Sequence, residues 1–191
     1  MNIQPVTLTG RTIRLEPLER RHAADMAQAA DSDTFRYHGL QPELSQEGFE
    51  AYIDTLLSRP AMVPFAQVLI ESGKAIGGTT YMDIQNANRG VEIGSTWISR
   101  AHHGTMVNPE AKYLLLRHAF EEQNAIRVQR KTDSRNLQSQ RAIEKLGAVK
   151  EGVLRNHMIM PDGYFRLTFM YSITNEEWPA AKARLEARLG Y

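Results

Sequence analysis

One run of sequence, over residues 92–116, constrains the fold more than any other: an apolar strand, a polar loop with a glycine, and a long helix. The first turn of a helix presents unpaired backbone N–H groups and the positive end of the helix dipole, both of which favour a bound phosphate. Asn108 is a preferred N-cap, Pro109 suits the first helical position, and Glu110 complements the dipole. Gly104 lets a ligand approach the backbone. The run therefore predicts an anion site at the start of a helix.

Hydrophobic periodicity places this run within a longer order of elements. Strands are predicted over 12–16, 65–70, 75–83, 91–98 and 127–132, helices over 19–30, from 45 onwards, over 109–124 and over 136–146, and a hairpin over 149–174. A final charged helix over 175–189 is expected to break near Pro179. Strand, helix and strand around 91–132 form a βαβ unit, whose two strands run parallel with a right-handed crossover.

Composition narrows the function classes. The 191 residues suit one domain, 1–191, with a core over 11–174 and the C-terminal helix outside it. A net charge of +1 provides no overall field for nucleic acid, so no direct nucleic-acid contact is expected. The absence of cysteine excludes disulfides, thiolate catalysis and cysteine metal sites. No apolar run approaches the ~20 residues of a membrane span and no signal peptide is evident, so we expect a cytoplasmic protein without a membrane partner.

A second motif follows the strand predicted over 127–132 and reads Asn136-Leu-Gln-Ser-Gln-Arg-Ala-Ile-Glu-Lys-Leu-Gly147. Together with 107–121 and 162–166, it resembles the GNAT superfamily of acetyl-CoA-dependent N-acetyltransferases, and most nearly the branch that acetylates the N-terminal alanine or serine of ribosomal proteins. The resemblance spans nearly the whole chain. It implies an α+β GNAT fold, with a mixed, mostly antiparallel sheet that is flanked by helices and splays between the fourth and fifth strands.

The resemblance also implies where acetyl-CoA, the co-substrate, is held. The pantetheine arm is expected in the split of the sheet, hydrogen-bonded to the backbone of Trp97 and Ile98, because an extended amide can add to an open strand edge. The pyrophosphate is expected on the loop before the helix, where phosphates are favoured. That loop comprises His103, Gly104, Thr105, Met106, Val107 and Asn108.

This loop departs from the usual family pattern of Gln or Arg, two residues, Gly, one residue, and Gly or Ala. Ala101 stands at the first position and Met106 at the last, although Arg100 offers a charge one residue earlier. Met106 still exposes its backbone N–H if its side chain turns into the core. His102 and His103 are adjacent, with no third ligand at a helical or hairpin offset, so no metal is assigned.

Three further residues are candidates for chemistry, each with a structural alternative. The resemblance implies that Asn136 contacts the pantetheine arm and that Ser139 hydrogen-bonds the departing thiolate, whereas both residues also suit a helix N-terminus. The tyrosine that many family members use for the second role is absent from 136–146. Glu92 points away from the face of Val91 and Ile93. It is therefore either a catalytic base, or a residue that holds a water molecule, at the split, or else a solvent-facing strand residue.

The leading hypothesis is transfer of an acetyl group from acetyl-CoA to a primary amine, with a ribosomal or other protein N-terminus as the acceptor and direct attack in a ternary complex. Two alternatives are an acetyltransferase for a small-molecule amine and a non-catalytic CoA-binding module. The C-terminal helix and the hairpin over 149–174 offer edges for a homodimer.

Overall fold

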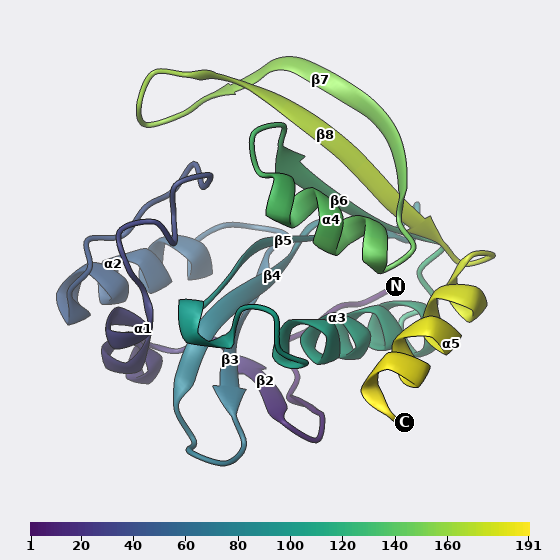
Figure 1. Ribbon diagram of the computed structural model, residues 1–191, viewed down its shortest axis with the longest axis horizontal. Coiled ribbons are helices and arrows are strands. Elements are labelled where there is room, and N and C mark those ends of the chain that lie inside the picture. The colour runs from purple at the N-terminus through teal and green to yellow at the C-terminus, as the bar shows by residue number, and fades with distance from the viewer.

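Eight strands form one mixed sheet in the computed structural model, which describes residues 1–191 (Figure 1). The sheet order is β1-β2-β3-β4-β5-β6-β8-β7, and only the neighbours β5 and β6 run parallel. This arrangement confirms the predicted mixed, mostly antiparallel sheet. The strands are β1 (Leu8–Thr9), β2 (Ile13–Pro17), β3 (Val63–Leu69), β4 (Ala75–Gln85), β5 (Gly90–Ile98), β6 (Arg127–Asp133), β7 (Val149–Ile159) and β8 (Phe165–Thr174).

Five α-helices cover the sheet in two groups, and each group has its own core. The smaller core joins α1 (Ala23–Ala29) and α2 (Gln46–Leu57) to the sheet around Trp97. The larger core joins α3 (Val107–Arg117), α4 (Leu137–Lys145) and α5 (Trp178–Leu189) to the sheet. None of these helices combines the length and apolar character that a membrane crossing requires.

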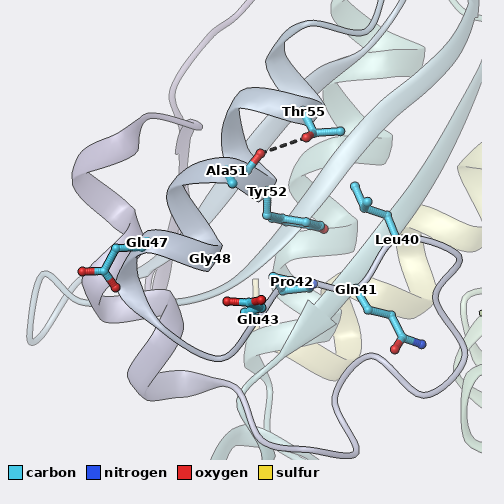
Figure 2. Close-up of a pocket in the computed structure, with 9 residues that line it drawn as sticks. All are labelled: Leu40, Gln41, Pro42, Glu43, Glu47, Gly48, Ala51, Tyr52 and Thr55. Carbon is cyan, nitrogen blue, oxygen red and sulfur yellow. Dashed lines mark hydrogen bonds between the residues drawn. The ribbon is translucent and has the colours of Figure 1, made fainter.

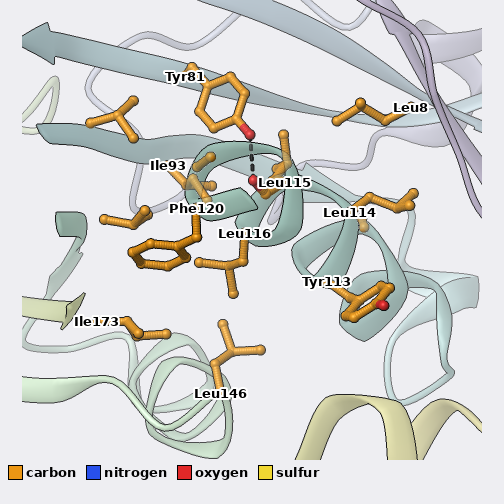
Figure 3. Packing of buried hydrophobic residues seen from close by; sticks show 14 of the residues in the cluster. Leu8, Tyr81, Ile93, Tyr113, Leu114, Leu115, Leu116, Phe120, Leu146 and Ile173 are labelled. Atoms are coloured by element: carbon orange, nitrogen blue, oxygen red, sulfur yellow. Dashed lines mark hydrogen bonds between the residues drawn. The ribbon is translucent and has the colours of Figure 1, made fainter. Parts of the chain in front are cut away.

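Helix α3 supplies the centre of the larger core (Figure 3). Leu114, Leu115 and Leu116 are consecutive and all buried, so the helix is apolar around most of its circumference and is enclosed by other elements. The hydroxyl of Tyr81, on β4, donates to the carbonyl oxygen of Leu115. This contact satisfies a buried polar group and fixes α3 against the middle of the sheet.

The sheet splits between β5 and β6, and this split positions the candidate site. Pairing is limited to Gly90–Glu92 with Arg127–Gln129, although β5 continues to Ile98 and β6 to Asp133. On its other side β5 bulges against β4, since Gly94 lies opposite Thr80 while Trp97 lies opposite Gly78. Ser95 in the bulge has a positive φ of 46°, which bends the strand away from β6. The predicted splay is confirmed.

Several boundaries differ from the predictions. The two-residue strand β1 is too short for periodicity to reveal. Counting it raises the number of every later strand by one, so the split predicted between the fourth and fifth strands lies between β5 and β6. Helix α5 starts at Trp178 with Pro179 in its first turn, where the missing N–H is tolerated, so the expected break is wrong. Strand β7 is an exposed edge of the sheet; the homodimer stays a prediction.

Helix α3 starts two residues earlier than predicted. Its N-cap is Met106 and its first residue is Val107, so Asn108 is not the cap and Pro109 is not the first helical residue. Glu110 does not serve mainly to complement the dipole. Its buried carboxylate accepts hydrogen bonds from backbone N–H groups of the turn before β2 and of the first residue of β2, and from the hydroxyl of Tyr191. Burial raises its pKa, but these hydrogen bonds outweigh that effect and lower it overall.

Candidate active site

The loop between β5 and α3 has free N–H donors, as the predicted phosphate site requires. After the short 3-10 turn Arg100–His102, Gly104 adopts a φ of +79°, and no atom lies within 4 Å of the place where a Cβ would stand. The N–H groups of Gly104 and Met106 donate no hydrogen bond within the protein. The loop is braced by Thr105, whose hydroxyl donates to the His102 carbonyl over 2.8 Å. The geometry fits an anion that takes its hydrogen bonds from the backbone.

The side chains of this loop do not all lie as predicted. Met106 is 42% exposed, so its side chain does not turn into the core. His103 faces the split: its Nε2 lies 3.1 Å from the carbonyl oxygen of Ile98, and its Nδ1 lies 3.4 Å from Nε2 of Gln138 on α4. His103 therefore connects the end of β5 to α4 across the mouth of the split.

The open edge of β5 lies beside this loop. The residues from Ile93 to Ile98 have no partner on β6, so this stretch of backbone can pair with an extended ligand. The carbonyl of Trp97 already accepts a hydrogen bond from Nε2 of Gln67 over 2.9 Å. The carbonyls of both residues that the resemblance assigns to the pantetheine arm thus have a partner within the protein, Gln67 for Trp97 and His103 for Ile98.

Helix α4 brings Asn136 and Ser139 to the same end of the split. Asn136 is the N-cap, because its side-chain oxygen accepts the N–H of Ser139 over 2.9 Å. Its structural role is therefore satisfied, and only its amide N–H groups remain for a ligand. The hydroxyl of Ser139 makes no hydrogen bond within the protein and is free to donate.

Glu92 lies at the apex of the split. Val91 and Ile93 point into the larger core, and Glu92 points to the opposite face, as the alternation along the strand predicts. It is 4% exposed, so it is not a solvent-facing residue. Its carboxylate forms a 2.7 Å ion pair with Nζ of Lys131 on β6, and Nε2 of Gln129 approaches it at 3.4 Å. The site thus contains a buried carboxylate bridging the two diverging strands.

The face that carries Glu92 is bounded by the hairpin β7–β8 and by the segment between α1 and α2, which approach each other in Figure 1. His157 on β7 lies 3.0 Å from the hydroxyl of Thr168. Burial and the charges of Lys131 and Arg166 lower its pKa, while the charge of Glu92 opposes them. A titratable imidazole and two cations therefore share this face with the carboxylate.

Two charged residues of the site were missed in the sequence. Lys112 on α3 is 1% exposed, and its Nζ donates only to the hydroxyls of Thr79 and Thr96, over 2.9 and 2.7 Å. Its spacing of three and four residues from Leu115 and Leu116 places it on a core-facing stripe, which was the available signal. Arg166 on β8 is 9% exposed. It lies in the 162–166 motif, whose position carried the resemblance but gave no role.

A separate cavity of about 400 Å³ lies between α2 and the segment that precedes it (Figure 2). The ring of Tyr52 forms part of its wall, and Glu43 and Glu47 border it. Tyr52 also packs against Phe35, which contacts Trp97 with ring centroids 5.1 Å apart. None of the nine lining residues belongs to β5, β6 or the loop before α3, so this cavity is distinct from the site at the split.

Solved structures that share the fold of this chain are described as acetyltransferases. A presumed acetyltransferase from T. thermophilus is 42% identical and superimposes with a TM-score of 0.92, covering 99% of this chain and 100% of that one. A GCN5-related N-acetyltransferase from Brucella melitensis is 29% identical, with a TM-score of 0.91 and coverage of 97% and 86%. The RimJ protein of Mycobacterium smegmatis, solved in complex with CoA-disulfide, is 23% identical and shares the fold, with a TM-score of 0.81 and coverage of 96% and 95%.

Among curated protein sequences, none matches the chain. A family profile described as the acetyltransferase (GNAT) domain matches residues 12–149, which is more than half of the chain. The matched residues include the split, the loop before α3 and the N-terminus of α4. The chain belongs to the GNAT family of acetyltransferases, whose members transfer an acetyl group from acetyl-CoA to an amine.

Proposed function

We propose that this acetyltransferase acts on the α-amine at the N-terminus of a protein or peptide, by direct attack in a ternary complex. The observation that carries the proposal is the buried carboxylate of Glu92 at the apex of the split, with the open edge of β5 and the loop around Gly104 leading up to it. A base, an extended binding edge and an anion site then lie in one continuous region.

The residues of this region suit acetyl-CoA. The free N–H groups of Gly104 and Met106, at the start of α3, would hold the pyrophosphate. The edge from Ile93 to Ile98 would hold the pantetheine arm as an added strand. When bound, the co-substrate supplies an acetyl thioester that an amine can attack. The relative from M. smegmatis, which shares the fold, is described in complex with CoA-disulfide, and this supports a CoA ligand for the chain.

The choice of an α-amine rests on proton affinity. A protein α-amine has a reference pKa of about 7.7 to 8.0, so roughly a tenth is neutral at pH 7, and exposing the lone pair costs only ~1.4 kcal/mol. A lysine amine would cost ~4.6 kcal/mol at the same pH. Glu92 is already paired with Lys131, so it suits the easier task of accepting a proton from an α-amine, directly or through a water molecule. The free hydroxyl of Ser139 would donate a hydrogen bond to the departing thiolate.

Mass spectrometry of acetylated products from a matched acceptor panel tests the proposal. The panel contains peptides with a free N-terminus, the same peptides with a blocked N-terminus and one internal lysine, and small amines without a peptide bond. We expect acetylation of the free N-termini, at least tenfold faster than of the lysines. Preference for the small amines would favour an acceptor of that class, and CoA binding without any transfer would indicate a non-catalytic module.

A further inference from the structure

Arg166 is a buried guanidinium without a carboxylate partner. Arg166 is 9% exposed, and no carboxylate lies within ion-pair distance of its guanidinium. One of its terminal nitrogens makes only long contacts, 3.4 Å to the carbonyl oxygen of Tyr37 and 3.5 Å to the sulfur of Met158. Its Nε is buried and has no partner. Burying such a group is costly unless something completes its hydrogen bonds.

The guanidinium of the neighbouring Arg135, in contrast, has a carboxylate and an aromatic ring as partners. It donates to both carboxylate oxygens of Asp133 over 3.1 and 2.9 Å, and it stacks on the ring of Tyr164 at 3.6 Å. The protein therefore gives Arg135 a carboxylate and an aromatic partner, whereas it gives Arg166 only two long contacts and leaves its Nε unpaired. An oxygen atom of a ligand could accept the hydrogen bonds that Arg166 does not make within the protein.

The register of β8 places Arg166 on the face of the sheet that carries Glu92. Met170 lies opposite Lys131 and Thr168 lies opposite Asp133, so Arg166 is the next residue on that face, beyond the end of β6. Burial lowers the pKa of Arg166, and the charges of Asp133 and Glu92 oppose that shift. The charge of Glu92 therefore acts on the guanidinium of Arg166.

The segment between α1 and α2 closes over Arg166. In addition to the contact with Tyr37, Gly39 lies so close to Met158 that a Cβ would stand 3.2 Å from its terminal methyl. Burial and the charge of Arg166 lower the pKa of His38 to about 4, so this imidazole is neutral at pH 7 and adds no second cation. Arg166 is therefore the buried cation at the place where this segment meets β7 and β8.

We infer that Arg166 binds the oxygen next to the amine of the acceptor, and so selects α-amino acyl compounds over simple amines. The inference rests on the proposed function and specifies its substrate class. In a peptide, the α-amine and the first carbonyl oxygen are separated by two carbon atoms, and in the inferred complex the amine faces Glu92 while the oxygen faces Arg166 on the same face of the sheet. The carboxylate of a free amino acid offers the same chemistry with a full negative charge, which favours a bidentate hydrogen bond.

The test compares three acceptors that share the three-carbon unit bearing the amine: alanylglycinamide with a peptide carbonyl, alanine with a carboxylate, and isopropylamine with no oxygen. Steady-state kcat/KM is measured for wild type, Arg166→Met, Arg166→Lys and the control Arg135→Met. For each acceptor, the ratio of variant to wild type is the quantity compared, because the ionisation of the amine then cancels. Calorimetric CoA affinity and the melting temperature of each variant report on folding.

We expect Arg166→Met to lower kcat/KM at least thirtyfold for alanylglycinamide, mainly through KM, and less than threefold for isopropylamine, with CoA affinity unchanged. Arg166→Lys should restore part of the difference, and Arg135→Met should leave it unchanged. A larger loss for alanine than for alanylglycinamide would identify the carboxylate as the preferred oxygen. Equal losses for the oxygen-bearing acceptors and isopropylamine would overturn the inference and make Arg166 a brace for the segment above it.

Binding of alanylglycinamide to the CoA-saturated protein, followed by NMR titration, separates this inference from the proposed function. If wild type acetylates no amine but binds the dipeptide amide, and Arg166→Met weakens that binding at least tenfold, the proposed function fails and the assignment of Arg166 stands. If the dipeptide amide binds wild type and Arg166→Met equally well, the assignment of Arg166 fails whatever the catalytic activity.

Discussion

The carboxylate of Glu92 and the ammonium of Lys131 lie 2.7 Å apart, across the point at which β5 and β6 diverge. The pair belongs to strands that are hydrogen-bonded up to Glu92 and separate beyond it. Glu92 is 4% exposed, so removing one partner would leave a buried charge, which is strongly unfavourable. An acceptor that enters as an ammonium would take the place of Lys131 beside this carboxylate.

Glu92→Gln should lower kcat/KM for α-amine acceptors by roughly tenfold to a hundredfold, since the base is lost while the shape of the side chain is kept. The rate would then depend on amines already neutral in solution, so its rise with pH should move to higher pH. Initial rates at pH 6 to 9 on a verified acceptor measure both effects. Glu151→Gln, which removes a glutamate from the more exposed pair with Arg127, is the matched control. An unchanged rate and pH profile would leave Glu92 with a structural role only.

Gly104→Val should weaken CoA binding at least tenfold, because a side chain at this position would cover the free N–H groups of the loop. A valine at this position would also strain the backbone, because the φ of Gly104 is +79°. Gly73→Val is therefore the control: it has a φ of +68°, it also has open space around it, and it lies in the turn between β3 and β4. Calorimetric affinities for CoA that are equal in the two variants would exclude the loop as the phosphate site.

Ser139→Ala should lower kcat by about tenfold and leave the affinity for CoA within twofold of wild type. The hydroxyl of Ser139 makes no internal hydrogen bond, and its N–H remains capped by Asn136, so the variant should keep α4 intact. Single-turnover rates and CoA titrations separate the two quantities. A loss of affinity equal to the loss of kcat would assign Ser139 to binding and not to departure of the thiolate.

Much of the region around the split could be predicted because its signals are local. The alternation of Val91, Glu92 and Ile93 gave the direction of the carboxylate, and the order of strand, helix and strand gave the parallel pair. The bulge at Ser95 had no comparable signal. Its positive φ occurs at a residue that ordinarily avoids it, and only the pairing with β4 imposes it.

Tertiary contacts explain the errors. Asn108 and Pro109 form a plausible helix start, but packing of Val107 into the core extends α3 by one further half-turn. On β8, strict alternation marks the apolar residues as the buried set. At the far end of this strand Phe165 is 60% exposed and Arg166 is buried, because the segment between α1 and α2 covers the polar face there. Such contacts join residues more than a hundred positions apart, so they produce no periodic pattern in the sequence.

Lys112 offers a test of stability that does not depend on activity. Burial, together with the charge of Arg130, lowers the pKa of Lys112 well below its usual value of 10.5. Its ammonium position contacts only the hydroxyls of Thr79 and Thr96, which also contact each other over 2.8 Å. The side chain therefore contributes a penalty for charge burial that its two hydrogen bonds offset only in part.

The sign of the pH dependence follows from the depressed pKa. Between the folded pKa and 10.5, the unfolded chain carries a proton on Lys112 that the folded chain lacks, so unfolding takes up a proton and this residue favours folding more as the pH rises. The slope can reach about 1.4 kcal/mol per pH unit. Lys112→Met removes the titrating group and keeps an unbranched side chain. We expect the variant to be more stable than wild type at pH 7, with an advantage that shrinks towards pH 9.5.

Urea unfolding of both proteins at pH 7, 8, 9 and 9.5 measures this difference, and comparing them at each pH cancels the titration of all other groups. Lys182→Met is the control, because Lys182 is paired with Glu121 over 2.8 Å and its pKa is raised. Its contribution is fully present throughout this pH range, so that variant should be less stable than wild type by an amount that does not change with pH. If the curves for Lys112→Met and wild type stayed parallel, Lys112 would be charged in the folded protein, and the hydroxyls of Thr79 and Thr96 would have to stabilise a full ammonium ion.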